Sequence, residues 1–305
     1  NRGGVERPEP PPPRSATVVG TGAMGPEIAA ALAAAGIAVT LAGRSEAAVA
    51  AAVDTARAWA SGGAPVDGAP IGPAALGDAG LVVETIAEDA GAKRELLGRL
   101  GGWVDEATIV VTNTSSLRIG DLASALPRPG RFAGLHFLKP AHLTAVVEVI
   151  PGPETSSGTV DALEAVAAAM GKAPLVVRED LPGFIWNRIQ FAVLRECLHL
   201  LEAGVADAGA IDAAVSDGLA PRWMAAGPLA TADLGGLRTF ALVAAQLFPE
   251  LSRARDVPEA LARPAREGGA LAPWTAAAGP AVAELRAETL AMGRAVAQRR
   301  RGRGA

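Results

Sequence analysis

The chain contains no tyrosine, one cysteine and three histidines among its 305 residues. A catalytic pair of Tyr and Lys is therefore impossible. With one thiol the chain can form neither an internal disulfide nor a Cys₄ zinc site, and no metal site is expected. Imidazole chemistry is left to three side chains: His136, His142 and His199.

Lysine is also scarce, since only Lys93, Lys139 and Lys172 occur among 28 cationic side chains. The formal net charge of −4 argues against a nucleic-acid partner. The longest uncharged run, from Ile28 to Gly43, has sixteen residues, short of the roughly 20 that a spanning helix needs. No membrane helix is expected.

The first 14 residues are rich in proline and lack the basic and apolar regions of a signal peptide. We expect residues 1–14 to be a disordered extension of a soluble, cytoplasmic protein. The other end, residues 298–305, is rich in arginine and glycine and is expected to be a disordered, solvated tail.

Between these ends, short β-branched runs alternate with Ala-rich helical stretches up to residue 179, which is typical of a parallel sheet built from βαβ units. The expected strands cover 16–19, 38–42, 80–86, 108–112, 132–137, 146–150 and 174–177. From residue 180 to 297 helical patterns dominate. The sequence thus predicts an α/β protein, with a Rossmann-type doubly wound sheet over 15–179 and an all-helical domain over 180–297.

A G-x-G-x-x-G motif follows the first expected strand and opens the first expected helix. Its glycines permit a tight turn, let the backbone approach a pyrophosphate and let helix and strand pack closely, while the helix N-terminus offers free N–H groups. The motif predicts a dinucleotide site with contacts from Gly20, Gly22, Ala23, Met24 and Gly25.

The end of the second strand usually carries an acidic residue that binds the ribose 2′-hydroxyl. Here Gly43 holds that place and is followed by Arg44 and Ser45. A guanidinium pairs well with a 2′-phosphate, so we expect NADP to be preferred over NAD. The alternative is that Arg44 and Ser45 only begin the next helix, with Ser45 as its N-cap.

Further polar residues lie at the ends of expected strands, where ligands bind in a doubly wound sheet. Oxidation of an alcohol needs a base that takes the hydroxyl proton, and an imidazole exchanges protons near neutral pH. A carboxylate on its other nitrogen fixes the tautomer. His136 and Glu148 can fill these two roles.

Four runs identify the family that the chain resembles between residues 15 and 237. They are N-T-S-S-L from Asn113, G-L-H-F from Gly134, a glutamate twelve residues after His136, and P-G-F-I-W-N-R from Pro182. In these runs the chain is similar to the L-3-hydroxyacyl-CoA dehydrogenases and to small-acid relatives such as L-gulonate dehydrogenase and carnitine dehydrogenase.

The resemblance implies that His136 and Glu148 form a catalytic pair and that Ser115 and Asn187 contact the reacting oxygen. It further implies that Glu88, Lys93 and Asn113 lie at the cofactor. The family also implies a homodimer that pairs through the helical C-terminal domain.

Two departures from the family bear on the substrate. Lys139 stands where the family has Asn, and an ammonium group beside the catalytic pair would favour an anionic substrate. Residues 60–78 contain no cation, although acyl-CoA enzymes often carry a Lys-rich helical hairpin there. The cations that usually bind the phosphates of a free acyl-CoA substrate are therefore absent from this segment, which argues against such a substrate.

Three functions stay open at this point. The first expectation is an NAD(P)-dependent oxidoreductase that interconverts a 3-hydroxyacyl thioester, bound to CoA or to a carrier protein, and its 3-keto form. The second is a dehydrogenase of a small free hydroxy acid. The third, of a different class, is a catalytically silent dinucleotide-binding or structural protein.

Overall fold

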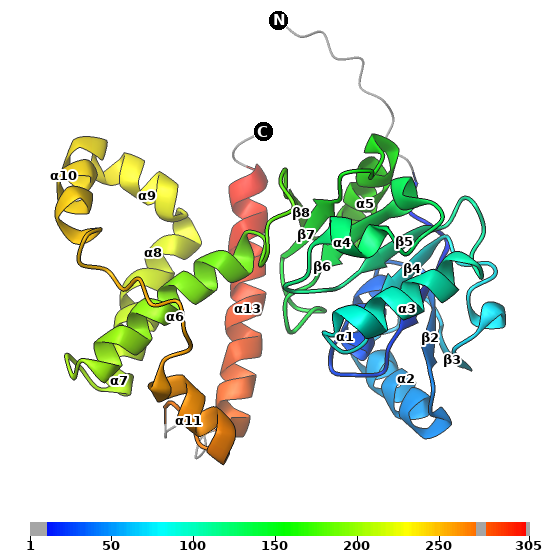
Figure 1. The fold of residues 1–305 in the computed structure, drawn as a ribbon, viewed down its shortest axis with the longest axis horizontal. Coiled ribbons are helices and arrows are strands. Elements are labelled where there is room, and N and C mark those ends of the chain that lie inside the picture. The colour runs from blue at the N-terminus through cyan, green and yellow to red at the C-terminus, as the bar shows by residue number, and fades with distance from the viewer. Residues whose placement is uncertain (1–10, 273–278, 303–305) are drawn as a thin grey trace, which may run out of the picture. The chain divides into compact units, whose positions relative to one another are not determined.

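The computed structural model describes residues 11–272 and 279–302, so most of the Pro-rich extension predicted at the N-terminus lies outside the described residues. The chain divides into two compact units between Asn187 and Arg188. The first unit is an α/β structure and the second is helical (Figure 1). Both fold classes are those predicted from the sequence.

The first unit contains one eight-stranded sheet of order β3-β2-β1-β4-β5-β6-β7-β8. Its strands are Ser15–Val19 (β1), Ala38–Gly43 (β2), Val66–Pro70 (β3), Leu81–Glu84 (β4), Ile109–Thr112 (β5), Phe132–His136 (β6), Val146–Pro151 (β7) and Ala173–Val176 (β8). The central strands β1, β4 and β5 are buried over almost their whole length, as strands covered on both faces must be.

Helices cover both faces of this sheet. They are α1 (Met24–Ala34), α2 (Glu46–Ala60), α3 (Ala90–Gly101), α4 (Ile119–Ala123) and α5 (Ser157–Ala169), with 3₁₀ turns at Pro73–Ala75 and Pro129–Arg131. Apolar residues of α1, α2 and α5 share one core cluster, while those of α3 and α4 belong to a second. Side chains accept hydrogen bonds at the N-caps of three of these helices: Ser45, Asp89 and Ser156.

Two features of the sheet differ from the prediction. Strand β3 was not predicted, because V-D-G-A-P has little β propensity and stands at a sheet edge, where proline is tolerated. Strand β7 pairs with β6 in antiparallel orientation instead of continuing the parallel pattern. The connection between β6 and β7 contains no helix, so no βαβ crossover forms there.

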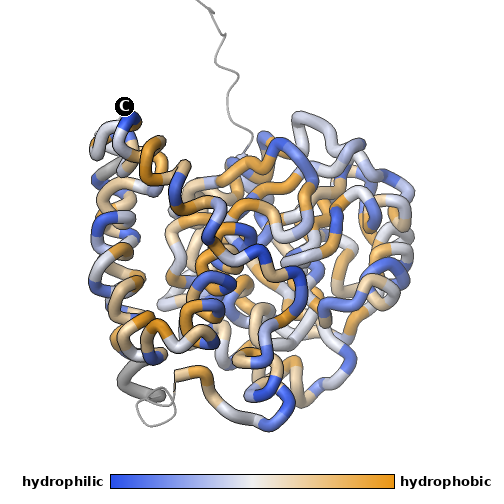
Figure 2. The backbone as a smooth tube through the Cα atoms, turned by 60° about the vertical axis from the view of Figure 1, so that its left-hand side comes forward, coloured by the Kyte–Doolittle hydropathy of each residue, from blue (hydrophilic) through white to orange (hydrophobic). Residues whose placement is uncertain are grey.

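The second unit is built from the helices that follow Asn187. They are the rest of α6 (Trp186–Glu202), α7 (Ala208–Ala213), a π-helix at Ala214–Leu219, α8 (Ala220–Ala225), α9 (Pro228–Gly235), α10 (Leu237–Leu247), α11 (Glu259–Glu267) and α13 (Gly279–Gly302). Residues 298–302, predicted as part of a disordered tail, belong to α13. That helix alternates between hydrophilic and hydrophobic residues in Figure 2. No helix of the described residues is long and apolar enough to cross a membrane.

Candidate active site

The glycine motif forms the turn between β1 and α1. Gly20 has a φ of +132°, and a Cβ atom there would lie 2.5 Å from the Thr85 carbonyl oxygen. A Cβ at Gly25 would lie 2.0 Å from the Gly20 oxygen, whereas one at Gly22 would meet nothing within 4 Å. No side chain caps α1, whose N-cap is Ala23. Close packing at two glycines, open space at the third and a helix N-terminus without a side-chain cap fit a bound pyrophosphate.

A cavity of about 550 Å³ opens beside this turn. It is lined by the turn itself, by the carboxyl ends of β2 and β4, and by α3. Gly20, Gly22 and Arg44 are among the lining residues, together with Gly43. The position and size suit the adenosine half of a dinucleotide.

Sequence reasoning missed the α3 wall of this cavity. Glu95 and Arg99 both line it, and the Arg99 guanidinium lies 4.8 Å from the centre of the Trp103 ring. Their spacing of four residues on a helix that follows β4 is the signal that could have found them. Ser45, in contrast, accepts a hydrogen bond from the Ala48 N–H as the N-cap of α2.

The predicted catalytic pair lies at the end of β6. His136 and Glu148 are partners in the antiparallel register of β6 and β7. The His136 Nδ1 atom lies 2.7 Å from Glu148 Oε2, and the two side chains are 3% and 0% exposed. The other carboxylate oxygen accepts hydrogen bonds from the Ile185 and Trp186 N–H groups, at 2.9 and 2.8 Å. Glu148 is thus held on both oxygens and fixes the orientation of the imidazole.

The other two predicted residues meet this pair. Ser115 Oγ lies 3.2 Å from His136 Nε2. Asn187 Nδ2 donates to the Ser115 carbonyl oxygen at 3.2 Å. The structure therefore brings together Ser115, His136, Glu148 and Asn187 from four separate segments. With Nδ1 directed at a carboxylate, Nε2 can carry the acceptor lone pair that a general base requires.

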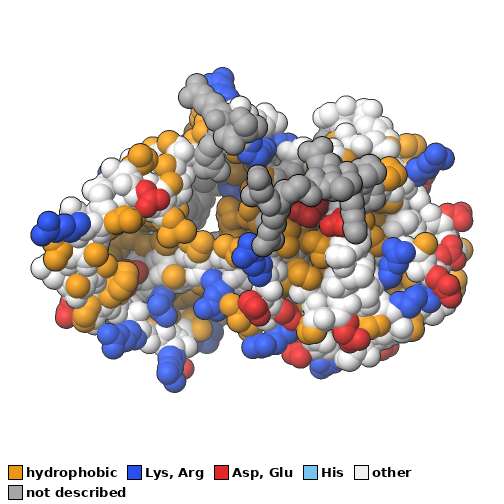
Figure 3. All heavy atoms as spheres, turned by 90° about the horizontal axis from the view of Figure 1, so that it is seen from above, with side chains coloured by type: hydrophobic (Ala, Val, Ile, Leu, Met, Phe, Trp, Pro, Cys, Tyr) orange, Lys and Arg blue, Asp and Glu red, His pale blue; other side chains and the backbone are white. Residues whose placement is uncertain are grey.

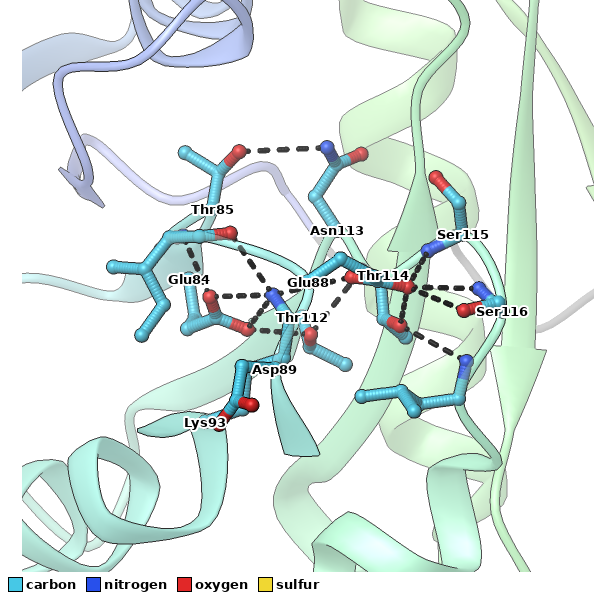
Figure 4. A network of polar contacts seen from close by, with 12 residues as sticks. Glu84, Thr85, Glu88, Asp89, Lys93, Thr112, Asn113, Thr114, Ser115 and Ser116 are labelled. Carbon is cyan, nitrogen blue, oxygen red and sulfur yellow. Dashed lines mark hydrogen bonds and ion pairs between the residues drawn. The ribbon is translucent and has the colours of Figure 1, made fainter. Parts of the chain in front are cut away.

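A glutamate holds the loop that carries Ser115 (Figure 4). Glu88 Oε1 accepts hydrogen bonds from Thr114 Oγ1 at 2.6 Å, and at 2.9 Å each from the Ser115 N–H, the Ser116 N–H and Ser116 Oγ. Burial alone would raise the pKa of Glu88, but these hydrogen bonds and the Lys93 charge lower it below its usual value.

Lys93 lies beneath this loop and does not line the cavity. Its ammonium group pairs with Glu84 Oε1 at 2.8 Å and lies 3.6 Å from Glu88 Oε2. Thr112 Oγ1 donates to the same Glu84 carboxylate. Asn113 accepts a hydrogen bond from the Phe137 N–H, which joins the Ser115 loop to the end of β6. These residues, inferred from the resemblance to lie at the cofactor, form the support of Ser115.

One more side chain borders His136, and a cation follows it closely in the sequence. Phe184, not identified from the sequence, is buried with its ring edge against the imidazole, 5.6 Å between centroids, at an unusual positive φ of 49°. Lys139 is exposed and lies three residues beyond His136.

Among the described residues, no group of His, Cys, Asp or Glu is arranged to hold a metal ion.

Comparison with known proteins decides the family. The model of the 3-hydroxyacyl-CoA dehydrogenase NAD binding domain matches residues 15–64 and 71–181, and that of the 3-hydroxyacyl-CoA dehydrogenase C-terminal domain matches residues 183–271. The chain belongs to the 3-hydroxyacyl-CoA dehydrogenase family. It is an oxidoreductase of that family and contains the family's NAD binding domain.

Two kinds of member resemble this dehydrogenase. A 5-formyl-3-hydroxy-2-methylpyridine 4-carboxylate 5-dehydrogenase of Mesorhizobium japonicum is 32% identical over 260 residues, which cover 80% of this chain and 83% of the relative. A crystal structure of an enzyme of that name, described as an NAD⁺-dependent dismutase, has a TM-score of 0.84 at 28% identity and covers 94% of this chain and 97% of its own. The crystal structure of the (S)-3-hydroxybutyryl-CoA dehydrogenase PaaH1 of Ralstonia eutropha has a TM-score of 0.63 at 33% identity, and the match covers 78% of this chain and 88% of that chain.

Proposed function

We propose that this dehydrogenase oxidises a secondary hydroxyl group of a small carboxylate, reversibly, with His136 as the general base. His136 Nε2 takes the hydroxyl proton, and a nicotinamide cofactor held at the glycine turn would supply the acceptor for the hydride that leaves the same carbon. Products are the carbonyl compound, the reduced cofactor and one proton. The observation that carries the proposal is the set of contacts among Ser115, His136, Glu148 and Asn187.

Each of these side chains has a task in that step. Glu148 directs the proton of the imidazole to Nδ1 and stabilises the positive charge that develops on the ring. Ser115 Oγ, 3.2 Å from Nε2, marks the place of the substrate oxygen and can donate a hydrogen bond to it. Asn187 steadies the Ser115 main chain through the hydrogen bond to its carbonyl oxygen.

A small free acid is favoured over the thioester by the segment between α2 and β4. This segment consists of a short loop, the edge strand β3 and a single 3₁₀ turn, and its residues 60–78 include no Lys or Arg to bind CoA phosphates. Lys139, beyond His136, supplies a cation for a carboxylate. The similarity to an enzyme named for a pyridine carboxylate supports the same choice.

Absorbance of the reduced cofactor at pH 7 tests this substrate class. Acetoacetate, acetoacetamide, acetoacetyl-CoA and an acetoacetyl carrier protein are compared at equal concentration, together with a panel of keto acids. We expect turnover of at least one free keto acid, and a kcat/KM for acetoacetate above that for its neutral amide. Preference for a thioester would contradict the free-acid proposal. Cofactor binding without turnover of any compound would favour a silent binding protein.

We also propose that NADP is preferred over NAD. No carboxylate stands at the end of β2 to repel a 2′-phosphate, and Arg44 lines the cavity beside Gly43. A charge-assisted hydrogen bond contributes about 1.5–3 kcal/mol. Arg44→Gln should therefore weaken NADPH binding by about 10- to 100-fold and NADH binding by less than about threefold. Arg94→Gln, on an exposed position of α3 outside the cavity lining, is the control. Tighter binding of NADH than NADPH by the unaltered enzyme would contradict the proposal.

The helical unit is proposed to pair with a second copy of the chain. Large apolar side chains are exposed along α9 and α10, including Leu229 at 85% and Leu234 at 82% (Figure 3). Such a surface is unusual for a monomer. We expect a dimer by light scattering at micromolar concentration, and a monomer when both leucines are changed to Glu. A monomeric unaltered chain across this range would contradict the dimer.

A further inference from the structure

Two buried charged side chains have no part in the proton transfer. Glu27, on α1, is 4% exposed, and Lys172, just before β8, is 3% exposed. A buried charge is costly unless it is paired or hydrogen-bonded, so such residues are expected to have a defined role. Both contact the segment that joins β6 to β7, residues 137–145, which we name the β6–β7 loop.

Glu27 and Lys172 bind the main chain of one loop residue, Ala141, at its N–H group and its carbonyl oxygen. Glu27 Oε2 accepts a hydrogen bond from the Ala141 N–H at 2.6 Å. Lys172 Nζ donates to the Ala141 carbonyl oxygen at 2.6 Å and to the Thr144 carbonyl oxygen at 2.5 Å. The anion meets an N–H group and the cation meets a carbonyl oxygen, so each charge matches the main-chain group it contacts.

The loop is placed where its position matters for the reaction. It begins directly after His136 and leads to β7, which carries Glu148. Its first residue is already fixed, because the Phe137 N–H donates to Asn113. Lys139, the proposed partner of the substrate carboxylate, lies two residues before Ala141. A shift of Ala141 would therefore move the main chain that carries Lys139.

Glu27 also connects this loop to the cofactor helix. It lies in the first turn of α1, the helix that begins at the glycine motif. The next loop residue, His142, stacks on Trp59 near the end of α2, with ring centroids 4.6 Å apart and an interplanar angle of 7°. The middle of the loop thus contacts α1, α2 and the segment before β8.

We propose that Glu27 and Lys172 are positioning residues for substrate recognition, which clamp the main chain of Ala141 and so fix the place at which Lys139 meets the substrate carboxylate. This inference rests on the proposed function, because it assigns the clamp to recognition of an anionic substrate. It predicts effects on KM and on the loop, with little effect on kcat or on cofactor binding.

The first test follows the loop without any substrate. Hydrogen exchange of residues 138–145 is measured by mass spectrometry in the unaltered enzyme, Lys172→Met, Glu27→Gln and the conservative variant Lys172→Arg. We expect exchange at least tenfold faster in Lys172→Met, and closer to the unaltered rate in Lys172→Arg and Glu27→Gln, which keep a donor or an acceptor. Arg57→Met removes an exposed cation of α2 that pairs with Asp67, and should leave the exchange unchanged.

The second test uses kinetics with the keto acid that turns over fastest in the panel, acetoacetate being tried first. We expect Lys172→Met to raise KM at least tenfold, with kcat within about threefold and the dissociation constant of the reduced cofactor within about twofold. For acetoacetamide, KM should change by less than about threefold. Because Lys172 acts through Lys139, the double variant Lys139→Met/Lys172→Met should be no worse than Lys139→Met alone.

Several outcomes would overturn the clamp. Multiplicative effects on KM in the double variant would show that Lys172 does not act through Lys139. An unchanged KM and unchanged loop exchange in Lys172→Met would remove its role. Should Lys172→Met not fold, the decision rests on the KM of Glu27→Gln, which should rise at least threefold; an unchanged KM in that variant would overturn the clamp. An unchanged KM in Lys139→Met would likewise overturn the role of the clamp in recognition. Failure of the proposed function is a separate result, in which the unaltered enzyme prefers a thioester or turns over no compound, and loop exchange then still reports whether Lys172 holds the β6–β7 loop.

Discussion

The glutamine variant of Glu148 tests the proposed mechanism most directly. In the folded enzyme one oxygen of this buried carboxylate meets His136 Nδ1 and the other accepts two N–H groups, from Ile185 and Trp186. A glutamine has one oxygen and one amide nitrogen for these two places. Its orientation decides which nitrogen of the imidazole carries the proton.

Hydrogen-bond energies choose the orientation. If the amide nitrogen faced Ile185 and Trp186, two partly buried N–H groups would lose their acceptor, at the lower end of about 1–3 kcal/mol each, so about 2 kcal/mol in total. The opposite orientation keeps both bonds and directs the amide N–H₂ at His136 Nδ1. The imidazole must then accept at Nδ1 and carry its proton on Nε2, the atom that faces Ser115. A protonated Nε2 cannot take the substrate proton, and a comparable tautomer change in a serine protease costs about 10⁴ in kcat.

We therefore expect Glu148→Gln to lower kcat by about 10³–10⁴, with the dissociation constant of the reduced cofactor changed less than about threefold. Initial rates measure kcat, and fluorescence titration measures the dissociation constant of the reduced cofactor. Nitrogen NMR of the three histidines reports the tautomer without substrate. Glu154→Gln, on an exposed turn after β7, serves as control. A kcat within tenfold of the unaltered enzyme, or an Nδ1–H tautomer in the variant, would refute the reasoning.

Four further variants test the supports of the site. Gly25→Ala places a Cβ 2.0 Å from the Gly20 oxygen and should lower the free energy of unfolding, measured in urea, by about 1–3 kcal/mol. Gly22→Ala should keep the stability of the unaltered enzyme but lose at least tenfold in cofactor affinity. Equal stability of the two variants would contradict the packing argument. Glu88→Gln should be less stable than the unaltered enzyme at pH 7. Because the folded pKa of Glu88 is lowered, its contribution is present above the unfolded value of about 4.3 and is lost as pH falls through the folded value, so a stability gap that does not shrink below pH 4 would count against it. Asp180→Ala removes the acceptor of the Ile119 and Gly120 N–H groups and should destabilise by about 1–2 kcal/mol in urea titrations; an unchanged midpoint would exclude that role.

Much of the sheet was predictable because its strands are apolar runs between clear helix patterns. Seven of the eight strands could be placed to within two residues of their observed ends, and only β3 was not predicted. The misses have physical causes. Strand β3 gains its place from pairing with β2 at the sheet edge, and the reversal of β7 follows from a connection too short for a crossover helix.

Of the candidate catalytic residues, His136 and Glu148 were predicted from their types and positions at strand ends, and Ser115 and Asn187 from the resemblance to the family. The contacts that support these residues were not predicted. Glu88 and Lys93 stand out in the sequence as polar residues near a strand end, yet only folding reveals that they hold the Ser115 loop. The α3 wall of the cofactor cavity was missed because helical residues become lining residues through the placement of the helix. No local feature of the sequence indicates that Lys172 holds the β6–β7 loop, because that contact forms only when β8 is placed beside β7.

The sequence by itself determined the fold class, the dinucleotide turn and the set of reactive side chains, because period, glycine spacing and residue type are local properties. It also determined the chemistry that is excluded, since a chain without tyrosine and with one thiol cannot acquire those groups by folding. Only the tertiary structure decided which carboxylate meets which donor. Glu27 and Ala141 are far apart in the sequence but form one hydrogen bond, and Glu148 reaches His136 only because β6 and β7 pair in antiparallel register. Such contacts depend on strand register and helix packing, which are properties of the whole folded unit.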